Sequence, residues 1–416
     1  EWRVILALIE PFRGIRYNLE KVGSLSDVCA PPYDVIDEAE KRRLLETSPY
    51  NSVRLILPED EDGEDRFSVA ARTLSEWMRQ GILLIDEQPS VYPYRMKYVH
   101  PSRGPQVTAG LVVSVSLDRR YRIVPHERTM AKPLEEQMRL LASTKANLSP
   151  VYLLVVPAQE YSGVVTKVAL EDWPLLGECT EPSGVEHCIY KIDEGDILQE
   201  LQSSMEEAVL VIADGHHRFE VARSFWEATR EPGSDRIMAL VVDLDQAAHG
   251  LQGTHRIIVG SADDPEELLK RFKAACGGSE EILPDPTSLY SLLDKGRVIL
   301  LTRHNASSPK HPLVSAHCSI FTASSASNEI SSTPSAWVHD SVLNTVPQDA
   351  VVFESSLETA FAAVIEGKAV AAILLPPPSL KVVTAVARAG SLLPQKSTYF
   401  YPKPRTGAVF RRFDAG

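Results

Sequence analysis

A carboxylate, two imidazoles and a guanidinium stand together in one short stretch of the chain, Ala-Asp-Gly-His-His-Arg at residues 213–218. A β-branched apolar run precedes the stretch and apolar residues at helical spacing follow it, which predicts a strand-to-helix corner. Backbone N–H groups at a helix start favour negative charge, and an arginine fork matches two phosphate oxygens. The predicted anion-site residues are Asp214, Gly215, His216, His217 and Arg218.

Asp214 is the odd member of this group, because a carboxylate beside a phosphate repels it unless it holds Mg²⁺, caps the helix or takes a proton. We therefore expect a metal-binding or catalytic role for Asp214. A structural interpretation stays open, in which Asp214 caps the helix, Arg218 pairs with an acid and both histidines lie on the surface. A zinc site is not favoured, since adjacent histidines point in different directions and no nearby Cys or His pair has the usual ligand spacing.

A second polar patch, Pro-His-Glu at residues 125–127, follows a strand pattern and precedes a helical pattern. Pro125 restricts the turn, so Glu127 is held at an element boundary, where a carboxylate can project into a cleft. Glu127 is a candidate general base, with His126 beside it. The alternative is an acid at a helix N-terminus that the helix dipole stabilises.

A third patch, at residues 393–404, is polar and cationic with interleaved aromatic residues. Lys396 stands next to the hydroxyls of Ser397 and Thr398, a combination that can bind a phosphate. The alternative is a strand that anchors the chain terminus and exposes its lysines to solvent.

Two turns add further candidates. His255 and Arg256 follow a small polar turn and are second anion contacts or part of a solvated loop. Two prolines force extended or turn geometry just before Tyr33 and Asp34, which then line a site or merely steer the chain.

The elements that must position these residues follow an α/β layout. Helices are predicted at residues 38–45, 66–80, 265–275 and 380–389, and after Gly215. Strands are predicted at residues 52–57, 91–99, 110–117, 148–156, 209–213, 236–245, 298–302, 318–321 and 369–375. Residues 157–200 form a mixed excursion, and the Ser- and Thr-rich residues 322–335 are a predicted surface connection.

Length and composition set the broad class. A chain of 416 residues exceeds the size of a single core, and we expect segments at residues 1–110, 111–260 and 261–416. The net charge of −13 argues against a broad nucleic-acid footprint. No apolar run reaches membrane-spanning length, the start lacks a secretory pattern, and five scattered cysteines form no CxxC pair. A cytoplasmic protein is expected, and the sequence indicates no oligomeric state.

The three patches together resemble the bacterial and archaeal family known as domain of unknown function 1015. Pro-His-Glu at 125–127, Ala-Asp-Gly-His-His-Arg at 213–218 and Pro-Gln-Lys-Ser-Thr-Tyr-Phe at 394–400 carry the resemblance, over nearly the whole chain. The middle of the chain also resembles the ParB and sulfiredoxin type of nucleotide-binding domain. The fold that this implies is mixed α/β, with a central nucleotide-binding domain at 111–260 between N- and C-terminal α/β regions.

Within that superfamily the free serine kinases are similar, and the resemblance implies ATP or ADP as donor, Mg²⁺, and L-serine or phosphoserine as substrate. It gives Glu127 the role of base and places Asp214, His216, His217 and Arg218 on the phosphates and Mg²⁺. The direction of transfer stays open. The residues expected to be catalytic are Glu127, Asp214 and His216. Those expected to contact the nucleotide are His126, Gly215, His217, Arg218, His255, Arg256, Lys396, Ser397 and Thr398.

Two alternatives stay beside the kinase hypothesis. The first is a non-enzymatic nucleotide-sensing module, as in ParB-type switches, and the second is nucleic-acid processing, which the acidic charge disfavours. The excursion at residues 157–200 departs from the compact kinase pattern and leaves the substrate pocket open.

Overall fold

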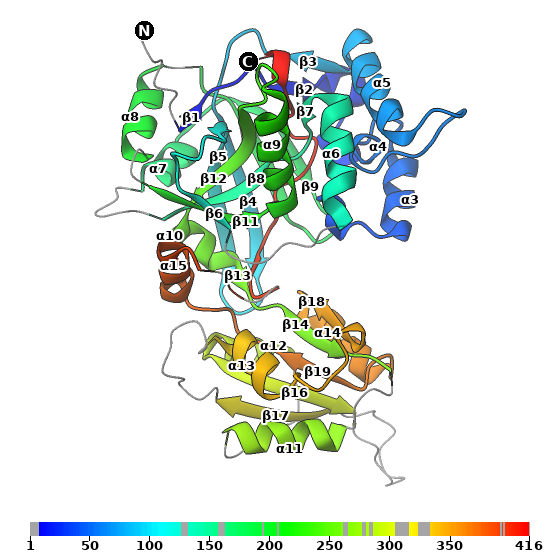
Figure 1. Ribbon diagram of the computed structural model, residues 1–416, viewed down its shortest axis with the longest axis vertical. Helices are drawn as coiled ribbons and strands as arrows, with labels where there is room; N and C mark the ends of the chain where they lie inside the picture. Colours follow the sequence, from blue (N-terminus) through cyan, green and yellow to red (C-terminus); the bar gives the residue numbers. More distant parts are fainter. Residues whose placement is uncertain are drawn as a thin grey trace.

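Two β-sheets organise the chain, one above the other in the computed structural model (Figure 1). The structure describes residues 8–125, 132–156, 163–193, 195–205, 208–260, 265–276, 280–282, 286–303, 316–322, 333–391, 393 and 396–415. No described helix combines the length and the apolar content that crossing a membrane requires.

The large sheet has nine strands and mixed direction. Its path runs through β6 (Ile123–Pro125), β11 (Val209–Asp214), β8 (Val151–Val156), β12 (Arg236–Asp243), β5 (Gly104–Ser116), β4 (Tyr92–His100), β10 (Glu186–Tyr190) and β9 (Leu175–Thr180), with β1 (Ile9–Glu10) beside β5. The β11–β6 and β12–β8 pairs are parallel and the other pairs of this sheet are antiparallel.

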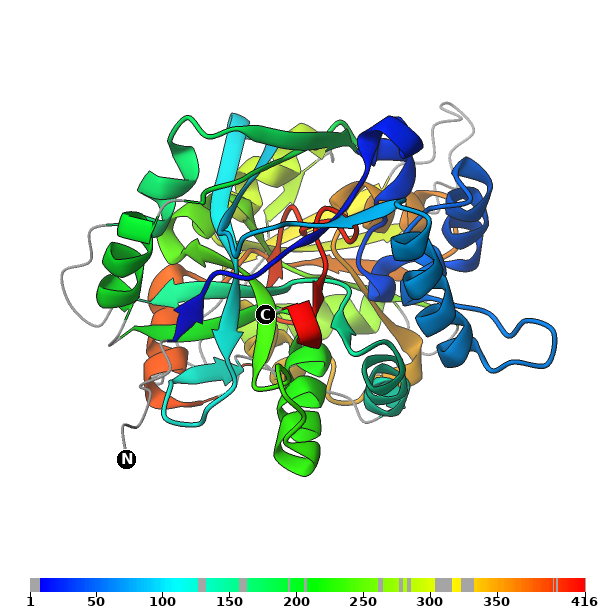
Figure 2. The ribbon, with the colours of Figure 1, turned by 90° about the horizontal axis from the view of Figure 1, so that it is seen from above.

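Alternating side chains bury both faces of this sheet. Along β8, Tyr152 and Leu154 join one core, whereas Val151 and Leu153 join the other. Helices α1 (Leu19–Val22), α2 (Leu25–Val28), α3 (Glu38–Thr47), α4 (Val53–Ile56) and α5 (Arg66–Arg79) cover the first face, and α7 (Val164–Leu170), α8 (Gly195–Met205) and α9 (His216–Thr229) cover the second. Figure 2 shows α3 and α5 on the side opposite α7 and α8. Helix α6 (Lys132–Thr144) lies against both α5 and α9.

The small sheet has six strands, and its strand pairs are antiparallel. Its order is β15 (Glu280–Ile282), β17 (Ala316–Thr322), β16 (Arg297–Arg303), β19 (Ala371–Leu374), β14 (His255–Ile258) and β18 (Val351–Glu354). Helices α11 (Pro265–Cys276) and α13 (Pro334–Ser341) pack on one face, and α12 (Pro286–Asp294) and α14 (Leu357–Ile365) pack on the other.

The chain passes from the large sheet to the small one and then returns. After α10 (Leu244–Ala247), β13 (Leu251–Gln252) pairs with β20 (Tyr399–Phe400), and α15 (Leu380–Ala389) precedes β20. Strand β21 (Arg411–Arg412) then pairs with β7 (Ala146–Asn147), and β2 (Ile15–Tyr17), which pairs with β3 (Leu83–Ile85), bonds to Phe410. The strands of the large sheet lie at residues 9–243, and Phe400, Val409 and Phe410, which follow the small sheet, join one of its cores. The small sheet is therefore an insertion in the chain that builds the large unit, which is the large sheet with its helices and the returning C-terminal segment.

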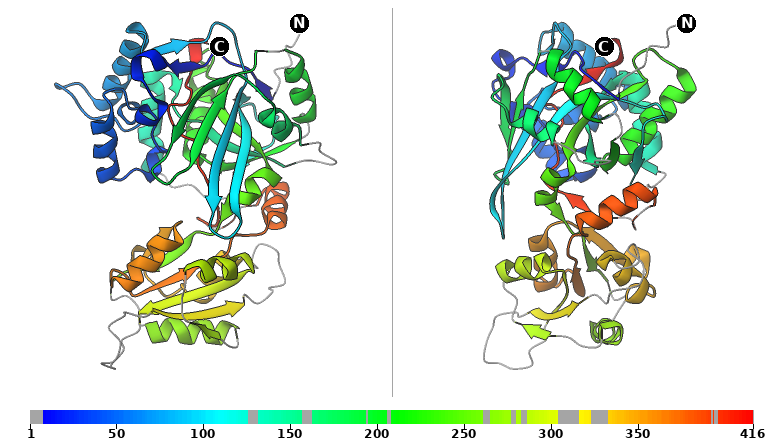
Figure 3. Two further views of the ribbon diagram at one scale, coloured as in Figure 1. Left: turned by 180° about the vertical axis from the view of Figure 1, so that it is seen from behind. Right: turned by 90° about the vertical axis from the view of Figure 1, so that its left-hand side faces the viewer.

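A hairpin also links the two sheets. The tip between β4 and β5 extends toward the small sheet (Figure 3). There Ser102 Oγ donates to Asp294 Oδ2 at 2.5 Å, and Arg103 Nη2 donates to Asp294 Oδ1 at 2.9 Å. The contact ties the hairpin to the end of α12.

Most predicted elements are present, but the strand predicted at residues 52–57 is wrong. Val53–Ile56 is the short helix α4, which packs against α5. The predicted boundary at residue 110 falls inside β5, so the first two predicted segments share one sheet. The boundary at 260 falls beyond β14, which belongs to the small sheet. Most of the predicted 322–335 connection lies outside the described residues.

Candidate functional site

The strand-to-helix corner predicted from the sequence is present at the end of β11. Asp214 is the last residue of the strand, and α9 begins at His216. Gly215 stands between them with a φ of 87°, in the left-handed region that suits glycine. No side chain caps the helix, so the interpretation of Asp214 as a cap is wrong.

The guanidinium of Arg218 folds back over Gly215. A Cβ at position 215 would lie 2.9 Å from Arg218 Nη2 and 3.0 Å from Cζ. The backbone conformation therefore favours glycine at position 215, and a larger residue there would also push the end of the Arg218 side chain aside.

Replacing Gly215 with alanine is expected to lower the free energy of unfolding by about 1–2 kcal/mol and to displace Arg218. Urea unfolding measures the first effect. The matched control is Gly260→Ala, because Gly260 has a similar φ of 76° with nothing near its added Cβ. Equal losses in the two variants would show that the contact with Arg218 is unimportant.

Asp214 is buried between two cations. Its Oδ2 lies 2.8 Å from Arg218 Nη2, and its Oδ1 lies 2.5 Å from Lys403 Nζ. Burial alone would raise the pKa of Asp214, but the charges of Lys403 and Arg218 outweigh it and hold the pKa well below its usual value. Asp214 is therefore a carboxylate at any physiological pH.

Arg218 is held on both sides. Its Nη1 donates to the carbonyl of Pro150 at 2.5 Å, while its Nη2 pairs with Asp214. Its Nε is buried and has no hydrogen-bond partner among the described residues. A buried donor of this kind is one that a ligand or a water can satisfy.

Lys403 is the residue that the sequence patterns missed. It follows β20, its side chain is only 12% exposed, and it also lies 3.7 Å from Asp34 Oδ2 and over the ring of Tyr399. Burial lowers the pKa of Lys403, yet Asp214 and Asp34 raise it above its usual value, so the lysine stays charged. It lies within the polar patch at 393–404, where Lys396 drew attention because two hydroxyls follow it.

These residues open on one cavity of about 460 Å³. Its walls are residues 33–35, 213–218, 353–355 and 398–400, together with Thr254, Lys396 and Lys403. The turn η1 (Tyr33–Val35) comes from the large unit and residues 353–355 come from the end of β18. The cavity therefore lies where the two sheets meet.

Most of the predicted site residues that the structure describes lie on this cavity. They are Asp214, Gly215, His216, His217, Arg218, Lys396 and Thr398. Tyr33 and Asp34, for which the sequence left two interpretations open, also line it. His126 and Glu127 lie outside the described residues.

The sheet does place Pro125, the last described residue before His126 and Glu127, relative to Asp214. Strand β6 runs parallel to β11, with Pro125 opposite Ile212. Parallel strands end at the same edge, so the chain passes Pro125 at the sheet edge where β11 ends in Asp214.

Three predicted contact residues stand behind the cavity wall instead of lining it. Ser397 is buried and accepts a hydrogen bond from Ser335. His255 Nδ1 accepts from Leu375 N, and burial, helped by the charge of Arg256, lowers the pKa of His255 to about 3. Arg256 donates to the carbonyl of Lys396 at 3.1 Å and lies 4.6 Å from the ring centroid of Phe353. Arg256 thus holds two cavity residues in place.

The cavity offers few ligands for a bound metal ion. The described residues contain no group of three or more His, Cys, Asp or Glu side chains placed to hold a metal ion. Both oxygens of Asp214 already contact cations. The residues fit an anion better, because Arg218, Lys396 and Lys403 line the cavity beside the start of α9.

One comparison with known proteins identifies a family. A family model described as protein of unknown function (DUF1015) matches residues 9–366. A search of curated proteins finds no significant match.

Several solved structures are similar at low scores. A conserved hypothetical protein from Pyrococcus furiosus is 14% identical, with 73% of this chain and 96% of that chain covered and a TM-score of 0.35. Free serine kinase in complex with AMP is 16% identical, with 69% and 86% covered and a TM-score of 0.34. C-terminally truncated SbnI from Staphylococcus aureus is 9% identical, with 71% and 85% covered and a TM-score of 0.36. At these scores the likenesses concern the general type of mixed α/β fold and carry no residue correspondence.

Proposed function

This chain belongs to the DUF1015 family, whose function is unknown, and we propose that its cavity binds a nucleotide and transfers a phosphoryl group to or from a small hydroxyl metabolite such as L-serine. The observation that carries the proposal is the convergence of cationic and polar residues from distant segments on one cavity. Phosphoryl transfer requires mainly positioning and charge neutralisation, which such a cavity supplies.

The phosphates of ATP or ADP are assigned to the corner at the start of α9. Arg218, Lys403 and Lys396 bring three positive charges to the same cavity. His216, His217 and the hydroxyl of Thr398 line the same walls. The aromatic rings of Tyr33, Phe353, Tyr399 and Phe400 give the cavity apolar surface against which a base can stack.

The ion pairs inside the cavity limit the order in which phosphate and Mg²⁺ can bind. In the structure Asp214 pairs with both Lys403 and Arg218, so a phosphate that binds either cation in the place of Asp214 must break that ion pair. Asp214 would hold Mg²⁺ only after that exchange, when its own oxygens become available. Glu127 stays the proposed base, on the strength of its motif and of the sheet edge from which its segment departs.

A cytoplasmic location belongs to the same proposal. Nucleotides are available there, and three cysteines, Cys29, Cys179 and Cys188, are buried free thiols that suit a reducing compartment.

Incubation of the purified protein with ATP or ADP, Mg²⁺ and an amino-acid panel tests the proposal, with mass spectrometry of the products. We expect phosphoserine, and we expect the Lys403→Met variant to form much less of it. Lys368→Met is the matched control, because Lys368 is a surface lysine, 75% exposed, away from the cavity. Absence of both nucleotide binding and phosphorylated product would exclude the proposal.

A nucleotide sensor is the second candidate, because the cavity has walls from both sheets. A ligand that contacts both would favour one arrangement of the two sheets over others. Calorimetry that shows nucleotide binding, combined with no serine-dependent turnover, would favour the sensor over the kinase.

A further inference from the structure

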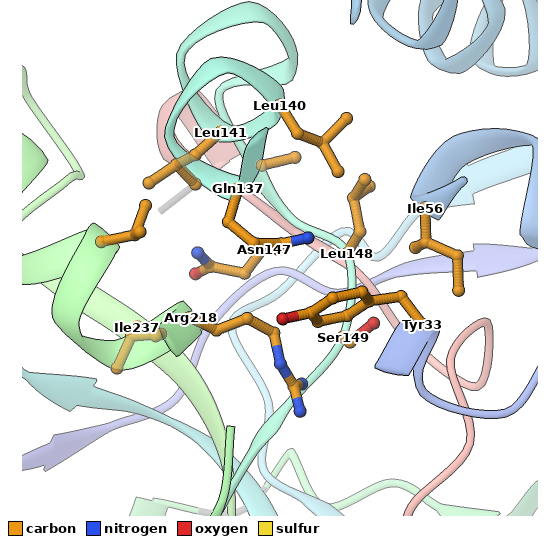
Figure 4. Close-up of a pocket in the computed structure, with 12 residues that line it drawn as sticks. Tyr33, Ile56, Gln137, Leu140, Leu141, Asn147, Leu148, Ser149, Arg218 and Ile237 are labelled. Atoms are coloured by element: carbon orange, nitrogen blue, oxygen red, sulfur yellow. The ribbon is translucent and has the colours of Figure 1, made fainter. Parts of the chain in front are cut away.

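A second, smaller cavity of about 40 Å³ lies behind Arg218 (Figure 4). Tyr33 and Arg218 line both this cavity and the large one, so these two side chains form a shared wall. Figure 4 shows the Tyr33 ring beside the Arg218 side chain, with Asn147, Ser149 and Gln137 around them. A ligand held here is adjacent to the proposed nucleotide.

The residues that line the small cavity favour a negatively charged ligand. Its polar lining is one guanidinium, two amides and two hydroxyls, from Arg218, Gln137, Asn147, Ser149 and Tyr33. No lining residue that the structure describes is acidic. Burial raises the pKa of Tyr33 to about 12, which keeps its hydroxyl neutral and able to donate. Such a lining accepts a negative group and gives nothing to balance an ammonium.

Two of these polar groups already have hydrogen-bond partners in the protein. Asn147 Oδ1 accepts from Met238 N at 3.0 Å, which leaves the amide N–H groups of Asn147 to face other partners. Ser149 Oγ lies 2.6 Å from Thr406 Oγ1. Arg218 lines this cavity, and its buried Nε has no partner among the described residues, so it is a donor that a ligand here can satisfy.

The size of the cavity limits what enters it. Since one water needs roughly 10–15 Å³ in this measure, 40 Å³ holds about three non-hydrogen atoms. A carboxylate group has that size. The remaining wall, which includes Leu140, Leu148 and Val221, is apolar and excludes a hydrated ion.

We propose that the small cavity is the carboxylate subsite of the phosphoryl acceptor, with the acceptor's hydroxyl directed toward the large cavity. The inference rests on the proposed function and narrows it, because the acceptor becomes a hydroxy acid or hydroxy amino acid and not an amino alcohol. The Nε of Arg218 donates to the carboxylate while the Nη atoms keep Pro150 and Asp214, so one guanidinium contacts both subsites.

Binding measurements with three small probes test this assignment. L-serine, glycolate and ethanolamine are titrated by ligand-observed NMR, with and without ADP. We expect the two carboxylates to bind and ethanolamine, which is serine without its carboxylate, to bind at least about tenfold more weakly. If none of the probes binds in either condition, the cavity holds water only and the assignment is wrong.

Gln137→Glu is the decisive variant, because it adds one negative charge to the small cavity with almost no change of shape. It is expected to weaken L-serine and glycolate by about tenfold or more and to leave the ADP dissociation constant unchanged. Ser143→Asp is the matched control, since it adds the same charge on an exposed position of α6. Unchanged L-serine binding in Gln137→Glu would overturn the carboxylate assignment. A wild-type protein that binds L-serine but does not bind ADP would instead count against the proposed function.

Discussion

The Lys403→Met variant is expected to unfold more easily by about 3 kcal/mol and to bind ADP at least about tenfold more weakly. The cause is the buried pair with Asp214, whose two side chains are only 12% and 11% exposed. Without the lysine, the Asp214 carboxylate keeps Arg218 as a neighbouring cation but loses the charge that offset most of the cost of its burial. Urea unfolding and calorimetry with ADP measure the two effects.

A double-mutant cycle separates the ion pair from other roles of Lys403. Asp214→Asn in the Lys403→Met background is expected to regain part of the lost stability, because the carboxylate that lost Lys403 is then neutral, although Arg218 also loses its acidic partner. Lys368→Met is the control for binding, since Lys368 is an exposed lysine that does not line the cavity. If Lys403→Met retains wild-type stability, the pair with Asp214 contributes nothing to the fold.

The Glu127→Gln variant is expected to lose about 10²–10⁴-fold in turnover while its ADP affinity stays unchanged. The amide keeps the size and polarity of the side chain but cannot take a proton from the acceptor hydroxyl. The parallel pair of β6 and β11 supports this expectation, because Pro125, the last described residue before Glu127, lies at the same end of the sheet as Asp214.

Steady-state kinetics with L-serine, together with calorimetry for ADP, measure the two halves of the Glu127 prediction. The control is Glu135→Gln, an exposed acid in the first turn of α6. Full phosphoserine formation by Glu127→Gln, with folding intact, would remove Glu127 as the base and leave the rest of the cavity assignment in place.

The sequence predicted the corner at Asp214 correctly because strand, turn and helix signals there are local. Val209–Asp214 is a short apolar run, Gly215 supplies the left-handed turn, and the periodicity after it is helical. Residues 52–57 show the limit of the same rule. A short apolar run fits a buried strand and a buried helix equally well, and packing against α5 favoured the helix α4.

The role of Lys403 was hidden for a different reason. Its partner Asp214 lies far away in the sequence, and local spacing carries no information about which distant charges become neighbours. The same applies to Phe353 and Ser355, which reach the cavity through the pairing of β18 with β14. Conversely, His255 and Arg256 looked like loop residues, but strand β14 buries both of them.

The return of the chain to the large sheet has a consequence for how the protein is made. Translation delivers residues in order, so the ribosome completes the whole inserted sheet before Lys403 and Phe410 emerge. Until then Asp214 lacks its ion-pair partner Lys403, and Ile15 lacks its backbone hydrogen bond to Phe410. The cavity of a nascent chain therefore cannot form until Lys403 has been synthesised, which happens after all the described strands of the large and small sheets have been made.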